Sequence, residues 1–357
     1  MAKENIKLSF SEKVNFFWVL ATAPFFVGWV GLRHYLLPPK DSPGVARIVA
    51  TTLLKTFCRL SQRQMKGMIN LPLTGKVIEQ YCTKHELAHE VEHLPNNATL
   101  HWVGSRPAKR SNVVLYFHGG GYNLPASPEH VVFAALCASE ANSSLAMLEY
   151  TLAPEGHFPT QLIQAAEALK HILTITPPSR IFIAGDSAGA HLSLSLLSHI
   201  MHPLPGVTPI KLSEDLGGIC PMSPFLSFDY NKESYDYNAE RDYLSLSQVK
   251  EFNASFKKPG LTDEEALKDP ALSLGDAPAG WWKNCPVDRV LLTMGAWEVF
   301  LDDCKAFGER LQSEASPKTM VEVVIGRKEV HAPCLQDTFL KRKDGDSWNA
   351  VMNWMSF

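Results

Sequence analysis

The chain has 357 residues, of which 45% are hydrophobic and 20% charged, and its formal net charge is −3. This composition is that of a globular protein with enough apolar material for a large core, in one large α/β domain or two smaller ones. The near balance of charge excludes a strongly basic nucleic-acid binder and a disordered acidic chain. The sequence contains no repeat of solenoid or propeller spacing.

A long apolar segment lies near the N-terminus. Val14 to Leu32 is a stretch of 19 residues without a charge, bracketed by Lys13 and Arg33. A helix of this length covers most of a bilayer core of roughly 30 Å. We expect residues 1–40 to form a single-pass membrane anchor, in a protein of the endoplasmic reticulum membrane. A cleaved signal peptide and a helix lying over the active site or on the membrane surface are the alternatives.

Residues 41–104 are expected to form cap helices and edge strands. Val45 to Ile69 has a basic amphipathic pattern, typical of a helix that lies on a membrane or covers a pocket. Residues 76–105 are expected to form strands and turns. They include an H-E-x-x-H sequence from His85 to His89, which binds zinc when it lies on a helix. Because the pattern fits a strand face equally well, we expect no metal site there.

From residue 113 onward, short apolar runs alternate with helical segments. The helical segments include 160–173 and 190–200. This alternation predicts an α/β domain over 105–357, with a mostly parallel sheet covered by helices on both faces. An aromatic-rich insertion at about 225–285 interrupts the pattern and is expected to line a pocket. The expected strands are 113–117, 144–150, 180–184, 217–223, 287–294 and 320–325.

A candidate nucleophile lies between one of these strands and the next helix. Gly185-Asp-Ser-Ala-Gly189 matches G-x-S-x-G, with a strand directly before it and a helix directly after it. That context is the setting of a nucleophile elbow. Ser187 would then project its hydroxyl at the helix N-terminus, where the amide of Ala188 and the helix dipole favour developing negative charge.

Three successive glycines follow the strand at 113–117, in the sequence HGGGY. Glycines let the backbone approach a substrate closely and direct several N–H groups at one point. A tetrahedral intermediate needs such donors where the carbonyl oxygen becomes an anion. The residues expected to form this oxyanion hole are Gly119, Gly120, Gly121 and Ala188.

The base and the acid are expected after the last two strands, in the chain order Ser, Asp or Glu, His. His331 follows the strand at 320–325 and is the last histidine of the chain. Glu298 lies in the loop after the strand at 287–294, and Asp302 comes one turn later, where a helix begins. Loop placement favours Glu298 as the triad acid, and Asp302 is the alternative.

With HGGGY, GDSAG and the late His331, the chain resembles the hormone-sensitive-lipase-like branch of the α/β-hydrolases. The sequence YTLAPE at 150–155, followed by Phe158-Pro159, is similar to the Y-R-L-A-P-E and F-P segments of that branch. The resemblance covers about residues 105–335. The apolar N-terminal segment and the W-E-x-F-x-D-D sequence at 297–303 are most similar to fungal steryl acetyl hydrolases and related hydrolases of secondary metabolism.

This resemblance implies an eight-stranded, mostly parallel sheet with an N-terminal helical cap. It implies that Ser187 is the nucleophile and His331 the base, and that Glu298 occupies a position where the branch usually has Asp. The main oxyanion donors that it implies are Gly120, Gly121 and Ala188.

The function expected from these motifs is that of a serine carboxylic-ester hydrolase that works through an acyl-enzyme. The substrate would be a small apolar ester, such as an acetylated sterol, terpenoid or other secondary metabolite. The alternatives are an acyltransferase or another non-hydrolytic biosynthetic enzyme (cyclisation or condensation) on the same scaffold, and a binding module. The expected partners are this substrate and a membrane, without nucleic acid, and the chemistry requires no metal or cofactor.

The seven cysteines contain no C-x-x-C pair, which argues against a structural zinc site or a dense disulfide framework. Three N-x-S/T triplets are candidate glycosylation sites, which would suit a lumenal domain. They begin at Asn97, Asn142 and Asn253.

Overall fold

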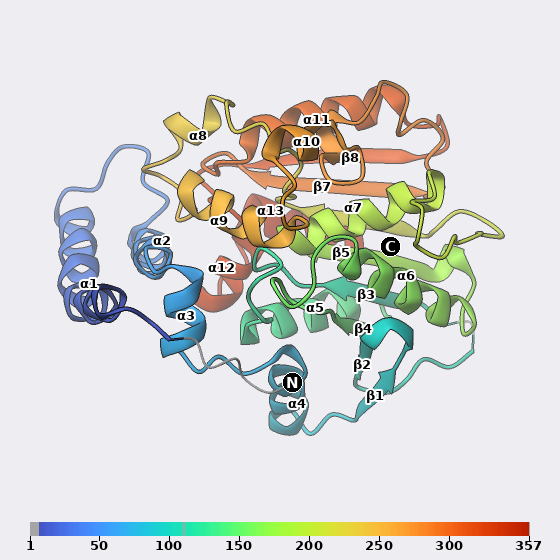
Figure 1. Cartoon of the computed structure of the whole chain (residues 1–357), viewed down its shortest axis with the longest axis horizontal. Helices are drawn as coiled ribbons and strands as arrows, with labels where there is room; N and C mark the ends of the chain where they lie inside the picture. The colour runs from blue at the N-terminus through green and yellow to red at the C-terminus, as the bar shows by residue number, and fades with distance from the viewer. Residues whose placement is uncertain (1–6, 110, 357) are drawn as a thin grey trace.

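The structure is a computed structural model that describes residues 7–109 and 111–356. Its centre is an eight-stranded sheet in the order β1-β2-β4-β3-β5-β6-β7-β8 (Figure 1). Strand β2 runs antiparallel to β1 and β4, and the other neighbours are parallel. The expected eight-stranded, mostly parallel sheet is confirmed. The strands are β1 (His89–His93), β2 (Thr99–Val103), β3 (Val113–Phe117), β4 (Ser144–Glu149), β5 (Ile181–Asp186), β6 (Gly218–Met222), β7 (Arg289–Gly295) and β8 (Met320–Gly326).

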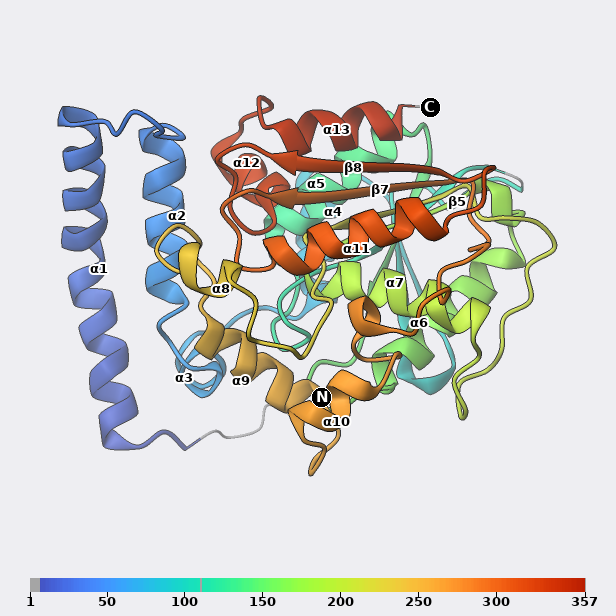
Figure 2. The ribbon, with the colours of Figure 1, turned by 90° about the horizontal axis from the view of Figure 1, so that it is seen from above.

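Helices cover both faces of this sheet (Figure 2). Leu115 packs in the core under α6, α7 and α11, whereas its neighbour Tyr116 packs in a second core under α4, α5 and α13. Because both faces are buried, strands such as β3 are apolar at every position. The helices are α1 (Phe10–Leu36), α2 (Val45–Phe57), α3 (Gln62–Met68), α4 (Thr74–Lys84), α5 (Pro128–Glu140), α6 (Thr160–Leu173), α7 (Ala188–Met201), α8 (Ser234–Tyr237), α9 (Leu246–Phe256), α10 (Asp263–Lys268), α11 (Leu301–Glu314), α12 (Pro333–Leu340) and α13 (Asp346–Met355).

Helices α1 and α2 form an antiparallel hairpin at one end of the molecule, and α2 lies between α1 and the rest of the chain (Figure 2). Phe16 and Val19 on α1 are buried, and Gly31 packs against Val49 of α2. The remaining surface of α1 is apolar and exposed, as at Phe25, which is 80% exposed. The long apolar helix expected from the sequence is therefore present, and one of its faces is part of the folded protein.

Two expectations for residues 41–104 are wrong in detail. Val45 to Ile69 is not one helix, because it divides into α2 and α3 at Ser61, whose side chain caps α3. Residues 76–84, expected as strand and turn, belong to helix α4. The reason is that Val77, Ile78 and Cys82 lie on one helix face at helical spacing and are buried together.

The H-E-x-x-H sequence runs from the end of α4 into β1, so its two histidines do not share a helix face. His89 instead contacts His101 of the neighbouring strand, with 3.0 Å between His89 Nε2 and His101 Nδ1. Within the part of the chain that the structure describes, no three His, Cys, Asp or Glu side chains group as metal ligands.

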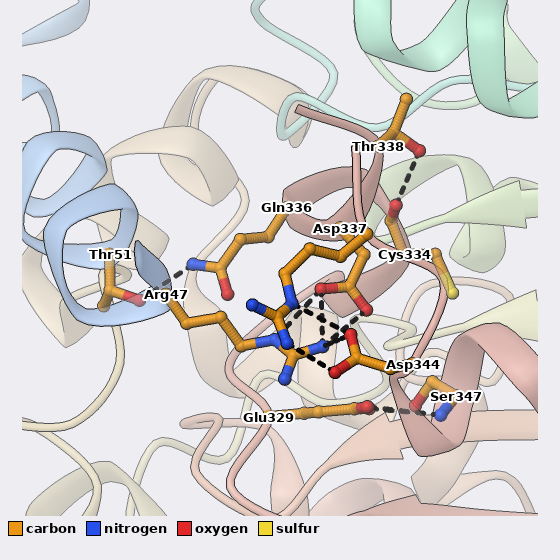
Figure 3. A network of polar contacts seen from close by, with 10 residues as sticks. Arg47, Thr51, Glu329, Cys334, Gln336, Asp337, Thr338, Asp344 and Ser347 are labelled. Carbon is orange, nitrogen blue, oxygen red and sulfur yellow. Dashed lines mark hydrogen bonds and ion pairs between the residues drawn. The ribbon is translucent and has the colours of Figure 1, made fainter. Parts of the chain in front are cut away.

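A polar cluster joins α2 to α12 (Figure 3). Arg47 of α2 forms ion pairs of 2.9 Å with Asp337 of α12 and with Asp344. Gln336 Nε2 donates to Thr51 Oγ1 at 2.8 Å, which is a second link between the same helices. Because α12 begins directly after the loop that carries His331, these contacts place α2 relative to the candidate active site.

Candidate active site

Ser187 occupies the turn between β5 and α7. Its φ of 52° and ψ of −116° are unfavourable for a residue with a Cβ, and its backbone N–H donates to Met222 O at 2.8 Å. A Cβ at Gly189 would collide with the carbonyl oxygen of Phe117, so this position requires glycine. The strained strand–turn–helix predicted from G-x-S-x-G is present, and it places the serine at the N-terminus of α7.

His331 lies in the loop between β8 and α12, with its Nε2 atom 2.8 Å from Ser187 Oγ. The rings of Phe300 and Tyr243 pack edge-on against the imidazole, with centroids at 5.1 Å and 5.9 Å. Burial lowers the pKa of His331 to about 4, because it penalises the charged imidazolium. Near neutral pH the ring is therefore uncharged, and it can accept the serine proton.

Glu298 lies on the other side of the imidazole, and its Oε2 is 3.8 Å from His331 Nδ1. This distance is longer than a hydrogen bond, and Nδ1 has no other partner among the described residues. The carboxyl group accepts hydrogen bonds from Ser223 Oγ at 2.6 Å and from Gly295 N at 3.1 Å. Burial raises the pKa of Glu298 to about 8, although the Ser223 hydroxyl opposes the shift.

The alternative acid, Asp302, is directed away from the imidazole. Its oxygens accept hydrogen bonds from Ser234 N at 2.8 Å and from the Tyr237 hydroxyl at 2.7 Å, both on α8. In the described part of the chain, Glu298 is the acidic side chain that comes within 4.0 Å of a ring nitrogen of His331.

A second buried carboxyl group, that of Asp242, was not among the residues expected at the site. It accepts backbone hydrogen bonds from His331 N at 3.2 Å, Val299 N at 2.9 Å and Tyr243 N at 2.8 Å. Asp242 thereby links the insertion to the loops of both the base and Glu298. Burial raises its pKa to about 7. No local motif marks this residue, and its position in the aromatic insertion was the only sequence signal.

The glycine loop lies beside the serine, and Gly120, Gly121 and Ala188 line the same cavity as Ser187. Gly120 and Gly121 have φ values of +105° and +60°, a region that favours glycine. Gly119 differs, because its N–H donates to Asp186 Oδ1 at 3.1 Å. Contrary to the expectation, the amide of Gly119 is therefore occupied and is not a free oxyanion donor.

Asp186 holds the glycine loop against the elbow. Besides the Gly119 amide, its carboxylate accepts a hydrogen bond of 2.8 Å from the Tyr116 hydroxyl, and His130 Nε2 lies 3.3 Å away. Since Asp186 directly precedes Ser187, these contacts connect the loop after β3 to the nucleophile. The G-x-S-x-G pattern allows any residue between Gly185 and Ser187, but in this chain Asp186 at that position holds the glycine loop in place.

A cavity of about 530 Å³ opens at Ser187, with mostly apolar walls. Helix α2 and the insertion both contribute to these walls. The insertion was expected to line a pocket, and covering a pocket was one of the two alternatives for Val45 to Ile69. Lining residues from these two regions include Leu53, Leu54 and Phe57 of α2, and Val249 and Phe252 of α9.

The three glycosylation triplets have different environments. Asn97 and Asn142 are exposed. Asn253 is buried in α9, and its Nδ2 donates to the Tyr230 hydroxyl at 3.0 Å. The folded protein has no room for a glycan at Asn253, so that expectation is wrong.

The fold agrees with the comparisons to known proteins. Residues 114–334 match the family described as the alpha/beta hydrolase fold. This is more than half of the chain, and the chain belongs to that family. The resemblance drawn from HGGGY and GDSAG is confirmed at this level.

Two relatives and one solved structure illustrate the similarity. The chain is 28% identical over 207 residues to an esterase of Acinetobacter venetianus, across 57% of this chain and 63% of that protein. It is 27% identical over 231 residues to an acetyl-hydrolase of Streptomyces hygroscopicus, across 63% of this chain and 70% of that protein. The matched segment thus spans about two thirds of either relative. The structure of an esterase from the bacterial hormone-sensitive lipase family superposes with a TM-score of 0.62 and 21% identity, covering 94% of this chain and 97% of that chain.

Proposed function

We propose that the chain is a serine carboxylic-ester hydrolase. The observation that carries this proposal is the 2.8 Å contact between Ser187 Oγ and His331 Nε2 at a strained elbow. A serine is a weak nucleophile until a neighbouring base can remove its proton, and this geometry provides that base. The relatives named esterase and acetyl-hydrolase support the same chemistry.

In this proposal Ser187 Oγ attacks the ester carbonyl carbon while His331 Nε2 takes its proton. The amides of Gly120, Gly121 and Ala188 stabilise the oxyanion of the tetrahedral intermediate. His331 returns the proton to the departing alcohol, which leaves an acyl-enzyme. Water, deprotonated by His331, then releases the carboxylic acid and restores the serine. In its ionised form, Glu298 stabilises the positive charge of the imidazolium during both steps.

We propose a small apolar ester as the substrate, with a short acyl group such as acetyl on an apolar alcohol of the sterol or terpenoid kind. The mostly apolar walls of the 530 Å³ cavity support an apolar alcohol. The relative named acetyl-hydrolase supports a short acyl group.

We also propose that α1 attaches the protein to a membrane. This helix of 27 residues is long and apolar enough to cross a bilayer. Its exposed face carries Trp18, Phe25 and Trp29, which are 68%, 80% and 65% exposed. A vesicle flotation assay tests this proposal. The wild-type protein is expected to float, and a Trp18→Ser/Phe25→Ser/Trp29→Ser variant is expected to float less. Equal flotation of the two proteins would contradict it.

A fluorophosphonate probe, which reacts with activated serines, tests the catalytic proposal. We expect the detergent-extracted wild-type protein to be labelled and to hydrolyse p-nitrophenyl acetate. Ser187→Ala should lose the labelling, and its activity should fall by roughly 10⁴-fold or more. A folded wild-type protein that neither reacts with the probe nor hydrolyses the ester would overturn the proposal.

A further inference from the structure

Helix α1 contacts the folded protein near both of its ends. Toward its start, Glu12 O accepts a hydrogen bond of 2.7 Å from Gln64 Nε2, and the Glu12 carboxylate lies 3.1 Å from Arg63 Nε. Toward its end, Gly31 is buried, and a Cβ there would lie 2.9 Å from Val49 Cγ2 of α2. Between Glu12 and Gly31 the helix rises by roughly 28 Å, which is close to the thickness of a bilayer core. Over this whole length, α1 lies along one side of the same folded unit.

The middle of α1 is held by the same unit. Phe16 and Val19 are buried, and the Arg59 guanidinium lies over the ring of Phe26, 5.2 Å from its centroid. If α1 crossed a bilayer while packed in this way, Phe26 would lie in the hydrocarbon and bring Arg59 with it. A guanidinium is costly at that depth, and so are the ion pairs that Arg47 makes on α2. The packing of α1 on α2 is therefore incompatible with a spanning orientation of α1.

The opposite face of α1 is apolar and open. No charged residue occurs from Val14 to Leu32. Tryptophan is enriched where proteins meet the membrane–water interface, and helices with one lipid-facing side lie in the plane of that interface. The large side chains exposed on this face are those of Phe17, Trp18, Phe25, Trp29 and Leu32.

Basic side chains stand at the two ends of this face. Lys13 lies near the start of α1, Arg33 near its end and Lys40 in the loop that follows, and all three are exposed. Cations at the edge of an apolar surface attract anionic lipid headgroups. The charge pattern thus favours a lipid surface over a second protein as the occupant of the face.

We propose that α1 lies in the plane of the membrane surface, with both of its ends on the side of the catalytic domain, and does not cross the bilayer. Helix α2 separates α1 from the cavity at Ser187, which it lines through Leu53, Leu54 and Phe57. The cavity is then held about one helix layer, roughly 10 Å, from the lipid. This inference rests on the proposed membrane attachment and specifies its geometry.

Single added cysteines test on which side of the membrane each end of α1 lies. Ser11→Cys is in the first turn of α1, Asp41→Cys is in the loop after it, and Lys318→Cys is in the catalytic domain between α11 and β8. All three positions are exposed. The native cysteines are buried or half-buried, so the wild-type chain gives the background. In sealed membrane vesicles from expressing cells, a membrane-impermeant maleimide should label all three sites alike, either all before detergent is added or all only after it.

A spanning helix predicts a different result, because Ser11 and Asp41 would lie on opposite sides of the bilayer. Labelling of Asp41→Cys and Lys318→Cys under one condition and of Ser11→Cys under the other would overturn the inference. Detergent exposes every site and gives the full extent of labelling to which each value is compared.

Two glycines of α1 provide a matched pair for its packing on α2. A Cβ at Gly28 meets nothing within 4 Å, whereas one at Gly31 meets Val49. If α1 stays packed on α2 in the membrane, Gly31→Leu should lower the melting temperature of the vesicle-bound protein by about 2 °C or more relative to Gly28→Leu, measured by tryptophan fluorescence. Equal melting temperatures would mean that α1 is detached from α2, and would also overturn the inference.

Flotation reports membrane attachment separately from this geometry. A protein that floats but fails the labelling or the melting test refutes only the in-plane orientation. A wild-type protein that does not float refutes the attachment and the orientation together. If such a protein is a dimer by light scattering, and the Trp18→Ser/Phe25→Ser/Trp29→Ser variant is a monomer, a second copy of the chain covers the apolar face in place of lipid.

Discussion

The two sides of His331 differ in how they are held together. On the nucleophile side, Ser187 lies 2.8 Å from Nε2, in a turn formed by one contiguous segment. On the acid side, Glu298 lies 3.8 Å from Nδ1. Its side chain accepts a hydrogen bond from Ser223, and its neighbour Val299 donates to Asp242, so two distant parts of the chain hold it. Local backbone sterics position the nucleophile, whereas long-range hydrogen bonds position the acid. We therefore expect conservative substitutions to be more informative on the acid side.

Among these substitutions, Glu298→Gln on the acid side is expected to cause the largest loss of activity. A glutamine cannot stabilise the imidazolium by charge, and its NH₂ group would replace an acceptor that faces Ser223 and Gly295. We expect kcat for p-nitrophenyl acetate to fall by roughly 10³- to 10⁴-fold. Asp302→Asn is the matched control and should lower kcat by about threefold or less, because Asp302 contacts α8 and not the imidazole. If Asp302→Asn lowered kcat more than Glu298→Gln did, Asp302 and not Glu298 would be the triad acid.

The pH dependence of kcat/KM tests the acid side of His331 without a substitution. Burial raises the pKa of Glu298 to about 8, so the carboxyl group holds a proton below that pH and is ionised above it. Only the ionised form can stabilise the imidazolium. We expect kcat/KM to rise with pH, by about tenfold per unit below about pH 7, and to level off above pH 8. A profile that is already level from pH 6 upward would contradict this expectation.

Asp242→Asn should weaken the link between the insertion and the two loops. Its carboxyl group accepts from the backbone N–H groups of His331, Val299 and Tyr243, so an amide NH₂ in place of one oxygen would oppose a donor. We expect kcat to fall by about tenfold or more, because His331 and Glu298 lose their common anchor. The melting temperature should fall as well. Asp236→Asn, an exposed change on α8, is the control and should leave both quantities unchanged. Unchanged kcat in Asp242→Asn would show that the link has no catalytic consequence.

The smallest effect is expected from Arg47→Gln, which acts at a distance from His331. The variant leaves Asp337 buried without its ion pair, which should cost about 1–3 kcal/mol of unfolding free energy. Since α2 forms a wall of the cavity, KM for a bulky acetate should rise by about threefold, with little change for p-nitrophenyl acetate. Arg342→Gln, which breaks a more exposed pair with Asp344, should change neither value measurably. Equal losses in both variants would argue against a specific role for the α2–α12 contact.

Short motifs were sufficient to locate the nucleophile side of the site. GDSAG and HGGGY predicted both turns, because a strained serine and close backbone approaches require small residues at fixed positions. The same motifs could not show which glycine amide is free. That of Gly119 is occupied by Asp186, and this depends on how two separate turns meet above the sheet.

Long-range contacts explain what sequence analysis missed. Asp242 is 89 positions before His331, and no spacing rule connects an insertion to the loop that it supports. Helix α4 was misread as strand because its apolar residues, Val77, Ile78 and Cys82, are few and the surrounding charges hide their helical spacing. Glu298 and Asp302 could be ranked by loop placement, but only the packing of α8 shows where Asp302 is directed.

By itself, the sequence determined the alternation of strands and helices, the elbow at Ser187 and the late histidine, because these depend on hydrophobic period and local backbone sterics. The tertiary structure alone decided that one face of α1 packs against the cap, that α2 and α9 wall the cavity, and that Glu298 and Asp242 lie against His331 and its loop. These features arise from the burial of surfaces that lie far apart along the chain. Such contacts are selected by the free energy of the whole fold and leave no local pattern in the residues that make them.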